Sequence, residues 1–266
     1  IRSRKRTKLM KKEIEKFADK LVNAYKKNKL ISPLPIKYTK NIKNANKLRK
    51  LCENKVNTEI VGFKAGGTAL PVLKKLKEKE PFYSAIFKNN VLKSGKSVKI
   101  NRSTLGIEVE VGYLISKKFF DNKQIITMKN VNKFITHMMP CIEIVGYRQK
   151  KQGIKFLGDL ASDFGANIKF LIGAKKKFRK VNIGNLKCNI KNVKTGNVVN
   201  GNTNSVYINP LNSLRFVLSK MKKDKVKLDS NFFVFTGSTV GVVPLKNKGN
   251  YIAKIEKIGT VKSVIR

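Results

Sequence analysis

The segment Leu105-Gly-Ile-Glu-Val-Glu-Val-Gly-Tyr-Leu-Ile115 alternates apolar residues with polar or small ones, which predicts a β-strand. A period of two places Glu108 and Glu110 together on one face of that strand, with the apolar residues on the other. Two neighbouring carboxylates repel each other, and a bound cation would remove the repulsion. Because the chain has only 16 Asp and Glu residues, this pair is the first candidate for a functional site.

The composition is that of a globular protein with a sizeable core. The 266 residues are 41% hydrophobic. No apolar run approaches the roughly eighteen residues that a transmembrane helix needs, so we expect no membrane span. The basic start, residues 1–8, is followed by no apolar segment, which argues against a secretory signal. The first residue is not Met, which leaves a trimmed organelle-targeted precursor open; otherwise we expect a cytoplasmic protein.

The charge balance is strongly basic, with 59 Lys and Arg against 16 Asp and Glu, a formal net charge of +43. One interpretation is binding to nucleic acid or, with less support, to an anionic membrane. The other is compositional bias, because Lys, Asn and Ile are abundant along the whole chain and Trp is absent. The scatter of basic residues favours bias, whereas the shortage of acids keeps nucleic acid binding as an alternative. Three widely spaced cysteines without a CxxC pattern indicate reduced thiols.

Hydrophobic spacing predicts a helical front section. Apolar residues recur at helical spacing over about residues 11–29 and again over about residues 41–54, with a Pro-containing break between them. We therefore divide the chain into an N-terminal helical section, residues 1–56, and a domain of mixed strands and helices, residues 57–266.

The second domain opens with a strand that ends in a glycine-rich turn. Lys64 lies on this strand, and Gly66, Gly67 and Thr68 follow it. Glycines let the backbone approach a ligand closely. A lysine within an apolar strand needs a reason to be there, which separates Lys64 from the many solvated lysines.

Further strands and helices follow in alternation, which predicts an α+β fold. Thr127 is expected to cap a helix that runs to about Met139, where Pro140 ends it. The segment at residues 141–145 predicts a strand that carries Glu143 between apolar neighbours. Near the end, a strand finishes in a polar turn whose hydroxyls or amides could face an anion: Thr236, Gly237 and Ser238.

Glu108, Glu110 and Glu143 together form a candidate site with oxygen ligands only. Such a set, without His or Cys, suits Mg²⁺, Mn²⁺ or Ca²⁺ rather than zinc. A carboxylate among apolar residues, such as Glu143, is either on a solvated face or held inside by a cation.

Several motifs, in this order, resemble the 2-keto-4-pentenoate hydratase family of the fumarylacetoacetate hydrolase superfamily. They are Val61-Gly-Phe-Lys-Ala-Gly-Gly-Thr68, Ile107-Glu-Val-Glu-Val111, Pro140-Cys-Ile-Glu-Ile-Val-Gly-Tyr-Arg148, Asp159-Leu-Ala-Ser-Asp163, Asn209-Pro-Leu-Asn212, Phe235-Thr-Gly237 and Lys257-Ile-Gly-Thr-Val261. The resemblance covers the chain from about Val61 onward.

The resemblance implies a fold, a metal and a set of roles. The fold is a mixed β-roll core of the fumarylacetoacetate hydrolase C-terminal type behind an N-terminal helical section. Mg²⁺ or Mn²⁺ would be the cofactor, with three carboxylates as its ligands and a lysine in the active site. The residues in these roles are Glu108, Glu110 and Glu143 for the metal and Lys64 for catalysis, and Asp163 matches an acidic position just past the third ligand. Together with the two turns described above, this makes the candidates for substrate binding Gly67, Thr68, Asp163, Thr236 and Gly237.

One departure from the family pattern concerns the acid/base residue. Hydratases of the family often carry Pro-Asp in the turn after the lysine motif, where this chain has Glu80-Pro-Phe-Tyr83. Phe82 therefore stands in the place of the Asp. Glu80 or Tyr83 could take over the role, and we include both as catalytic candidates.

The expected function is that of a divalent-metal-dependent lyase, a hydratase for 2-oxo or 2-hydroxydienoic acids as in aromatic catabolism. The metal would stabilise an enolate, and water would then add to the double-bond system. Because of Phe82, decarboxylation or carbon–carbon hydrolysis by the same superfamily chemistry stays open. A basic RNA-binding or ribonucleoprotein role on this fold is the alternative from another class. The resemblance also implies a homo-oligomer, at least a dimer.

Overall fold

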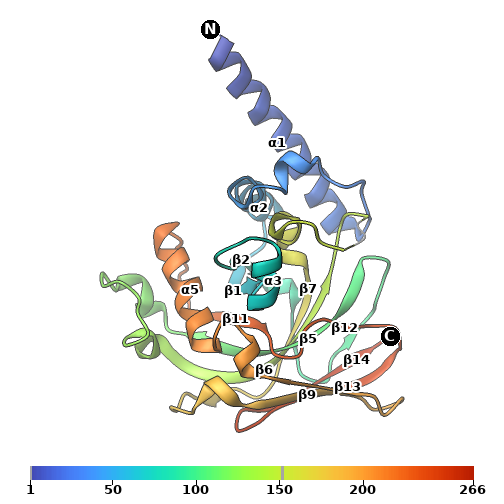
Figure 1. Ribbon diagram of the computed structural model, residues 1–266, viewed down its shortest axis with the longest axis vertical. Coiled ribbons are helices and arrows are strands. Elements are labelled where there is room, and N and C mark those ends of the chain that lie inside the picture. Colours follow the sequence, from blue (N-terminus) through green and yellow to red (C-terminus); the bar gives the residue numbers. More distant parts are fainter. Residues whose placement is uncertain (1, 151–152) are drawn as a thin grey trace.

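The computed structural model describes residues 2–150 and 153–266, and for residues 2–11 it describes the backbone alone. Two β-sheets form the body, and α1 projects from it with the N-terminus at its far end (Figure 1). The α-helices are α1 (Arg2–Lys27), α2 (Ile42–Val56), α3 (Leu70–Lys75), α4 (Leu157–Ala161) and α5 (Pro210–Lys223). Short 3-10 helices lie at Ile36–Tyr38, Lys88–Asn90, Lys117–Asp121, Val131–Phe134, Phe164–Ala166, Ile183–Asn185 and Thr203–Ser205.

The larger sheet is mixed, and its strands follow the spatial order β2-β1-β11-β5-β6-β7-β3. β1 runs parallel to β11, and β3 parallel to β7, while the other pairs are antiparallel. β12 adds to β5, and β8 adds to β6. The bounds are β1 (Ile60–Gly66), β2 (Phe82–Phe87), β3 (Val91–Lys93), β5 (Thr104–Ile115), β6 (Ile135–Gly146), β7 (Asn167–Ile172), β8 (Lys176–Lys177), β11 (Phe232–Ser238) and β12 (Val243–Pro244).

A smaller sheet has the order β10-β9-β13-β14-β4. Its strands are β4 (Ser97–Val98), β9 (Lys187–Asn192), β10 (Val198–Asn202), β13 (Gly249–Ile255) and β14 (Gly259–Ile265). The two sheets share one apolar core, in which Val109 and Ile142 of the larger sheet belong to the same cluster as Ala253 and Val261 of the smaller one. The sheets and the flanking helices confirm the predicted α+β class, whereas the division into domains at residues 56 and 57 stays a prediction.

The two predicted N-terminal helices are confirmed as α1 and α2, which pack against each other. The Asn41 side chain caps α2 by accepting a hydrogen bond from the Lys43 amide at 2.9 Å. Within α2, Arg49 and Glu53 form a buried ion pair at 2.7 Å. Glu53 also accepts a hydrogen bond from the Ala85 amide at 2.8 Å, so this pair ties the helical section to β2.

The helix predicted from Thr127 to Met139 is wrong. β6 begins at Ile135 and pairs with β5 as far as Gly146, with Pro140 opposite Val111 inside the strand. The apolar spacing of this segment fits a helix, but the long antiparallel pairing gives the backbone its hydrogen-bond partners instead. Pro140 is tolerated because it lies beyond the end of the β6–β7 pairing, which begins at Cys141.

Candidate metal centre and cavity

The pairing of β5 with β6 brings three carboxylates to one place. Glu108 and Glu143 are directly opposite each other across the two antiparallel strands, and Glu110 lies two residues further along β5 on the same face. One carboxylate oxygen from each of the three residues lies within 4.8 Å of the other two. Glu110 and Glu143 are fully buried, while Glu108 is half-buried.

These carboxylates have fewer partners than their burial requires. Glu110 Oε2 accepts a hydrogen bond from the Gly237 amide at 2.8 Å. Among the described residues, Glu110 Oε1 and Glu143 Oε2 accept no hydrogen bond, and Glu143 Oε1 has only an ion-pair contact with Lys64 Nζ. Buried polar atoms are nearly always satisfied, so oxygens left over at one point indicate a missing ligand. Three carboxylates with free oxygens fit a hard divalent cation such as Mg²⁺ or Mn²⁺.

Electrostatics agrees with this interpretation. Burial, followed by the charge of Glu143, raises the pKa of Glu108 to about 7. Burial and the charges of Glu143 and Glu108 raise the pKa of Glu110 well above its ordinary value. Ionising all three carboxylates in this buried place is therefore unfavourable, and a bound divalent cation would offset that cost.

Lys64 reaches the same carboxylates from β1. Its Nζ lies 3.0 Å from Glu143 Oε1, and its side chain is almost completely buried. Burial acts to lower the pKa of Lys64, but the charges of Glu143, Glu108 and Glu110 outweigh it and leave that pKa raised. One ammonium opposite three carboxylates leaves the site net negative when all of them are ionised.

Lys64 and Glu108 lie in the lining of a cavity of about 360 Å³. This volume falls within the usual range of small-molecule sites. Gly67, with φ +70°, turns the chain beside the cavity, and a Cβ there would lie 2.4 Å from Leu157 Cδ1. The described lining residues are Lys64, Ala65, Gly66, Gly67, Thr68, Ala69, Val72, Phe82, Leu105, Glu108, Val145, Tyr147, Ile154, Leu160, Gly165, Ala166, Ser205, Gly237, Ser238, Gly241 and Val242.

Of the predicted substrate-binding residues, Gly67, Thr68 and Gly237 line the cavity, whereas Thr236 and Asp163 do not. Thr236 is buried behind the site, where its hydroxyl donates to the Val111 carbonyl at 2.8 Å. Its place in the fold is therefore structural.

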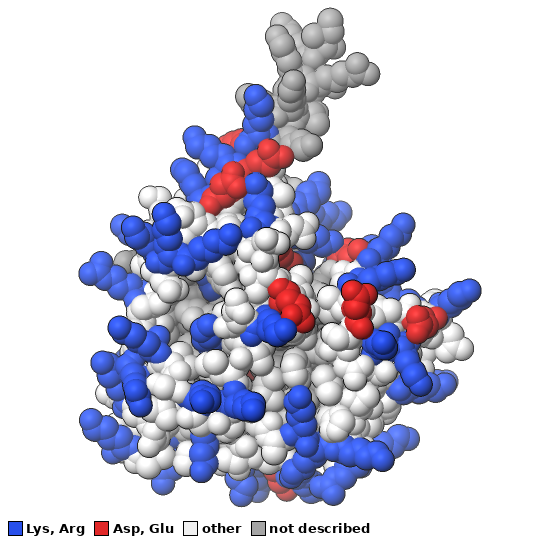
Figure 2. All heavy atoms as spheres, turned by 180° about the vertical axis from the view of Figure 1, so that it is seen from behind, with Lys and Arg blue, Asp and Glu red and all other residues white. Residues whose placement is uncertain are grey.

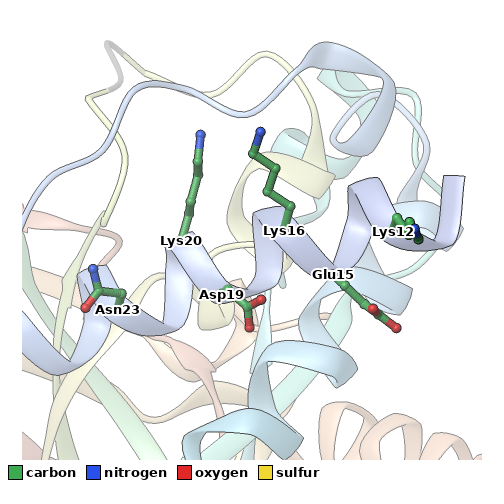
Figure 3. A pocket seen from close by; sticks show the side chains of 6 residues that line it. All are labelled: Lys12, Glu15, Lys16, Asp19, Lys20 and Asn23. Carbon is green, nitrogen blue, oxygen red and sulfur yellow. The ribbon is translucent and has the colours of Figure 1, made fainter. Parts of the chain in front are cut away.

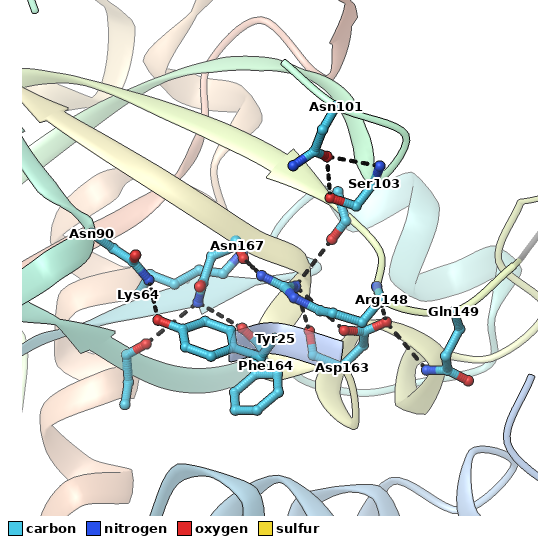
Figure 4. A network of polar contacts seen from close by, with 12 residues as sticks. Tyr25, Lys64, Asn90, Asn101, Ser103, Arg148, Gln149, Asp163, Phe164 and Asn167 are labelled. Carbon is cyan, nitrogen blue, oxygen red and sulfur yellow. Dashed lines mark hydrogen bonds and ion pairs between the residues drawn. The ribbon is translucent and has the colours of Figure 1, made fainter. Parts of the chain in front are cut away.

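Asp163 belongs to a buried polar network next to the cavity (Figure 4). It forms an ion pair with Arg148 at 3.3 Å and accepts a hydrogen bond from the Arg148 amide at 2.8 Å. The Arg148 guanidinium also donates to the Asn167 carbonyl and lies 5.5 Å from the centre of the Phe164 ring. The network holds the turn at residues 164–166, in which Phe164, Gly165 and Ala166 all have positive φ.

The two candidates for the acid/base role, Glu80 and Tyr83, lie away from the cavity. Glu80 is exposed and pairs with Lys220 of α5. Tyr83 donates a hydrogen bond to Asp224 at 2.5 Å, and the Arg49 guanidinium lies 4.7 Å from its ring centre. Phe82 lines the cavity instead, with its ring centre 6.0 Å from Lys64 Nζ. Neighbouring residues of a strand face opposite sides, so β2 turns Phe82 toward the cavity and Tyr83 toward the other face, where it is also buried.

Tyr147 is a polar lining residue that the sequence reasoning missed. Tyr147 follows Glu143 and Val145 at a period of two, and this alternation predicts that the three side chains lie on the same face. Burial, followed by the charges of Asp163, Asp159 and Glu108, raises the pKa of Tyr147 to about 12. Its phenol is therefore neutral near pH 7.

Elsewhere in the described part of the chain, no other group of His, Cys, Asp or Glu residues converges closely enough to hold a metal ion. Figure 2 shows Lys and Arg side chains spread over one face with other residues between them, as compositional bias would produce. On α1, a shallow depression carries both signs of charge, with Lys16 and Lys20 pointing away from Glu15 and Asp19 (Figure 3). Asp19 is paired with Lys55 at 2.7 Å. No helix in the described part of the chain has the length and apolarity to cross a membrane.

Comparison with known proteins supports the resemblance stated above. No family model matches the sequence. A protein of Burkholderia vietnamiensis named 2-keto-4-pentenoate hydratase is 24% identical over 212 residues, 79% of this chain and 79% of that protein. A protein of the same name from Paraburkholderia phymatum is 24% identical over 208 residues, 77% of each. The predicted resemblance to the 2-keto-4-pentenoate hydratase family is thereby confirmed.

Solved structures show the same fold. The 4-oxalocrotonate decarboxylase of Pseudomonas putida G7, complexed with magnesium and adipate, has a TM-score of 0.85 at 16% identity and covers 96% of this chain and 98% of its own. The fumarylpyruvate hydrolase of Pseudomonas aeruginosa, in complex with Mn²⁺ and pyruvate, has a TM-score of 0.59 at 11% identity and covers 78% of this chain and 89% of its own. The predicted fold of the fumarylacetoacetate hydrolase superfamily is confirmed.

Proposed function

We propose that this chain is a divalent-metal-dependent lyase for 2-oxo or 2-hydroxydienoic acids, similar to 2-keto-4-pentenoate hydratase. The observation that carries the proposal is the convergence of Glu108, Glu110 and Glu143, with unsatisfied buried oxygens, on Lys64 at a cavity. The hydratase names of the two curated relatives support a lyase. The magnesium and manganese in the similar structures support those metals for this site.

The three carboxylates and Lys64 have different roles at the site. Glu108, Glu110 and Glu143 would hold Mg²⁺ or Mn²⁺, and the bound ion would supply a Lewis acid for the 2-oxo and carboxylate oxygens of a substrate. Lys64 is a buried ammonium 3.0 Å from Glu143. It can stabilise negative charge that develops on a substrate, or move a proton to or from it.

The other lining residues offer hydrogen bonds and exclude water. Tyr147 presents a neutral phenol, which can donate a hydrogen bond or a proton. The Phe82 ring closes one side of the cavity and has no proton to give. Glu80 and Tyr83 have no part in the proposal, because they contact α5 or the residue that follows it.

A second reaction is favoured by one observation. Phe82, and not a carboxylic acid, faces Lys64 across the cavity. Loss of CO₂ from a second carboxylate conjugated with the 2-oxo group leaves the bonding electrons as the same kind of enolate that proton removal gives, and this step needs no base. Decarboxylation is therefore the alternative within the superfamily, and carbon–carbon hydrolysis is a third possibility on the same scaffold.

The test is a product assay with 2-hydroxypenta-2,4-dienoate for hydration and its 5-carboxy derivative for CO₂ release, each with Mg²⁺, with Mn²⁺ and with a chelator. We expect metal-dependent turnover of at least one substrate by the wild type and none by Glu108→Ala. Turnover that is unaffected by the chelator would remove the proposal. The matched control is Glu59→Ala, since Glu59 is exposed and pairs only with Lys88 among the described residues.

Two further expectations concern the binding partners of the protein. We expect a homo-oligomer, on the resemblance alone, and a small-molecule substrate as the partner.

The alternative function, RNA binding, rests on the net charge of +43, and it predicts an affinity for RNA that falls steeply as the salt concentration rises. Absence of RNA binding at physiological salt would eliminate that alternative.

A further inference from the structure

A second cavity, of about 300 Å³, is lined by residues from the end of α1, from β7 and from the 3-10 helix Lys88–Asn90. Its volume lies at the lower end of the range of small-molecule sites. None of its described lining residues belongs to the cavity beside the metal centre. The second cavity is therefore a separate candidate for ligand binding.

The second cavity is lined by cations and neutral groups only. Among its described lining residues are Lys26, Lys29, Arg148 and Lys169, and there is no Asp or Glu. Surface lysines alone carry no information in a chain with 59 Lys and Arg. The absence of acids does, because a cluster of like charges without counter-ions is unfavourable and an anionic ligand would relieve it.

Another basic cavity, between α2 and α5, shows the difference. Its lining includes Glu80, which pairs with Lys220, and Asp224, which pairs with Lys50 at 2.8 Å. There the protein provides its own counter-ions. In the second cavity only Arg148 has one, namely Asp163 at 3.3 Å.

Lys169 is the cation of the second cavity that most needs a partner. It is half-buried on β7, and its Nζ donates to the Asn89 carbonyl at 2.8 Å and to Asn90 Oδ1 at 3.1 Å. Both acceptors are neutral, and burial lowers the pKa of Lys169. An ammonium has three N–H donors, so two hydrogen bonds leave one for a ligand.

The groups next to Lys169 are oriented to donate. Asn90 is 5% exposed, and its amide donates to the Tyr25 hydroxyl at 2.8 Å while its Oδ1 accepts from Lys169 (Figure 4). Since the Tyr25 oxygen accepts this bond, its own hydrogen can be donated to a ligand. The Tyr25 ring also contacts the Arg148 guanidinium, at 5.6 Å from the ring centre.

The rim adds further positive charge. Lys26 and Lys29 are exposed at the end of α1, and neither forms an ion pair among the described residues. The C-terminal end of a helix carries about half an elementary negative charge, which is less than these two ammonium groups supply. Together with Lys169, three positive charges without counter-ions surround one small space.

We propose that the second cavity binds a phosphate-class anion, either inorganic phosphate or the phosphomonoester group of a small molecule. Lys169 and Tyr25 donate to it inside the cavity, and Lys26 and Lys29 stand at the rim. A phosphate dianion balances more of the three positive charges than a carboxylate does, and it offers more acceptor oxygens. The inference goes beyond the proposed function, and it holds whether or not Glu108, Glu110 and Glu143 bind a metal.

The test is the binding of radiolabelled inorganic phosphate to the whole chain, measured by equilibrium dialysis in chelator at physiological salt. We expect one saturable site in the wild type and an affinity weaker by at least about tenfold in Lys169→Met, which loses a charged donor. The matched control is Lys254→Met, which removes an exposed lysine of β13 and should bind phosphate as the wild type does.

Uptake of phosphate without saturation, or equal affinity in the wild type, Lys169→Met and Lys254→Met, would overturn the inference and assign the binding to the net charge of +43. Competition with glycerol 3-phosphate distinguishes the two sources of the anion. Displacement at lower concentration than unlabelled phosphate supports a phosphomonoester ligand, and displacement at higher concentration supports the free ion.

Asn90→Asp gives an independent check that keeps Lys169 in place. The new carboxylate would lie where Asn90 Oδ1 now accepts from Lys169 at 3.1 Å, so the protein would contain its own counter-ion. We expect phosphate binding to weaken at least about tenfold, and phosphate to raise Tm in the wild type but not in Asn90→Asp. Phosphate affinity in Asn90→Asp equal to that of the wild type would overturn the inference.

Discussion

Glu108 and Glu143 occupy directly opposite positions on β5 and β6, so that two carboxylates share one cross-strand pair inside the protein. Like charges directly opposite each other destabilise a sheet. Lys64 offsets part of this repulsion through its contact with Glu143. The arrangement therefore costs stability in the metal-free protein, and a divalent cation would remove that cost.

The metal-free protein should lose stability as pH rises through the range in which Glu108 ionises. Burial and the charge of Glu143 raise the pKa of Glu108 from 4.5 to about 7. Between those values the folded chain binds more protons than the unfolded chain, so raising the pH lowers the free energy of unfolding. Thermal unfolding in chelator should show Tm falling from about pH 5 to about pH 8, and added Mg²⁺ should oppose the fall at the upper end. A Tm that rises over this range in both conditions would contradict the account.

Lys64→Met should destabilise the metal-free protein more than the metal-bound one. The substitution leaves Glu143 buried without its cation, and breaking a buried ion pair in this way costs about 3–5 kcal/mol. Saturating Mg²⁺ should restore more of the free energy of unfolding in Lys64→Met than it adds to the wild type. The matched control is Lys88→Met, whose exposed partner is Glu59 and whose expected loss is about 0–1 kcal/mol. Chemical denaturation of both variants, with and without metal, makes the measurement.

Phe82→Asp should shift the reaction toward hydration. The new carboxyl group would lie where the Phe82 ring now faces Lys64, at the cavity, where it can exchange a proton with a bound substrate. Phe82→Leu removes the ring without adding an acid and serves as the control. The ratio of hydration product to CO₂ should be higher in Phe82→Asp than in Phe82→Leu. An identical ratio in the two variants would show that the position has no part in proton transfer.

Gly165→Ala should weaken ligand binding while leaving metal affinity nearly unchanged. A Cβ at Gly165 would lie 2.1 Å from Ser84 Oγ and 3.0 Å from Lys64 Cε, at a φ of +67° that favours glycine. Lys64 or the turn must then shift, although Glu108, Glu110 and Glu143 have no contact with the new methyl group among the nearest atoms. Mn²⁺ and 2-oxohexanoate titrations separate the two effects. Gly153→Ala, in open space at a φ of +76°, controls for backbone strain alone.

The sequence alone predicts that Glu108 and Glu110 share one face of β5, but it does not predict which residues surround them. A period of two predicted that Glu108 and Glu110 share a face, because alternation is a local property of a strand. Their meeting with Glu143 depends on the β5–β6 register, which no local pattern contains. The resemblance to a known family supplied that link.

The errors arose where one pattern fits two structures. Val131, Phe134, Ile135 and Met138 have helical spacing, yet only Val131–Phe134 is helical, as a short 3-10 helix, and β6 begins at Ile135. Alternation in β2 predicts that Phe82 and Tyr83 face opposite sides, but it does not say which of them faces Lys64. The pairing of β2 with β1, with Ser84 opposite Lys64, decides that Phe82 faces the cavity.

The central claim is that Glu108, Glu110 and Glu143 hold a divalent cation, and direct Mn²⁺ binding tests it. Titration of the metal-free wild type, Glu108→Ala and the surface control Glu59→Ala can be followed by the electron paramagnetic resonance signal of free Mn²⁺. We predict one tight site in the wild type and in Glu59→Ala, and an affinity weaker by at least about tenfold in Glu108→Ala. Equal Mn²⁺ affinity in all three proteins would contradict the account.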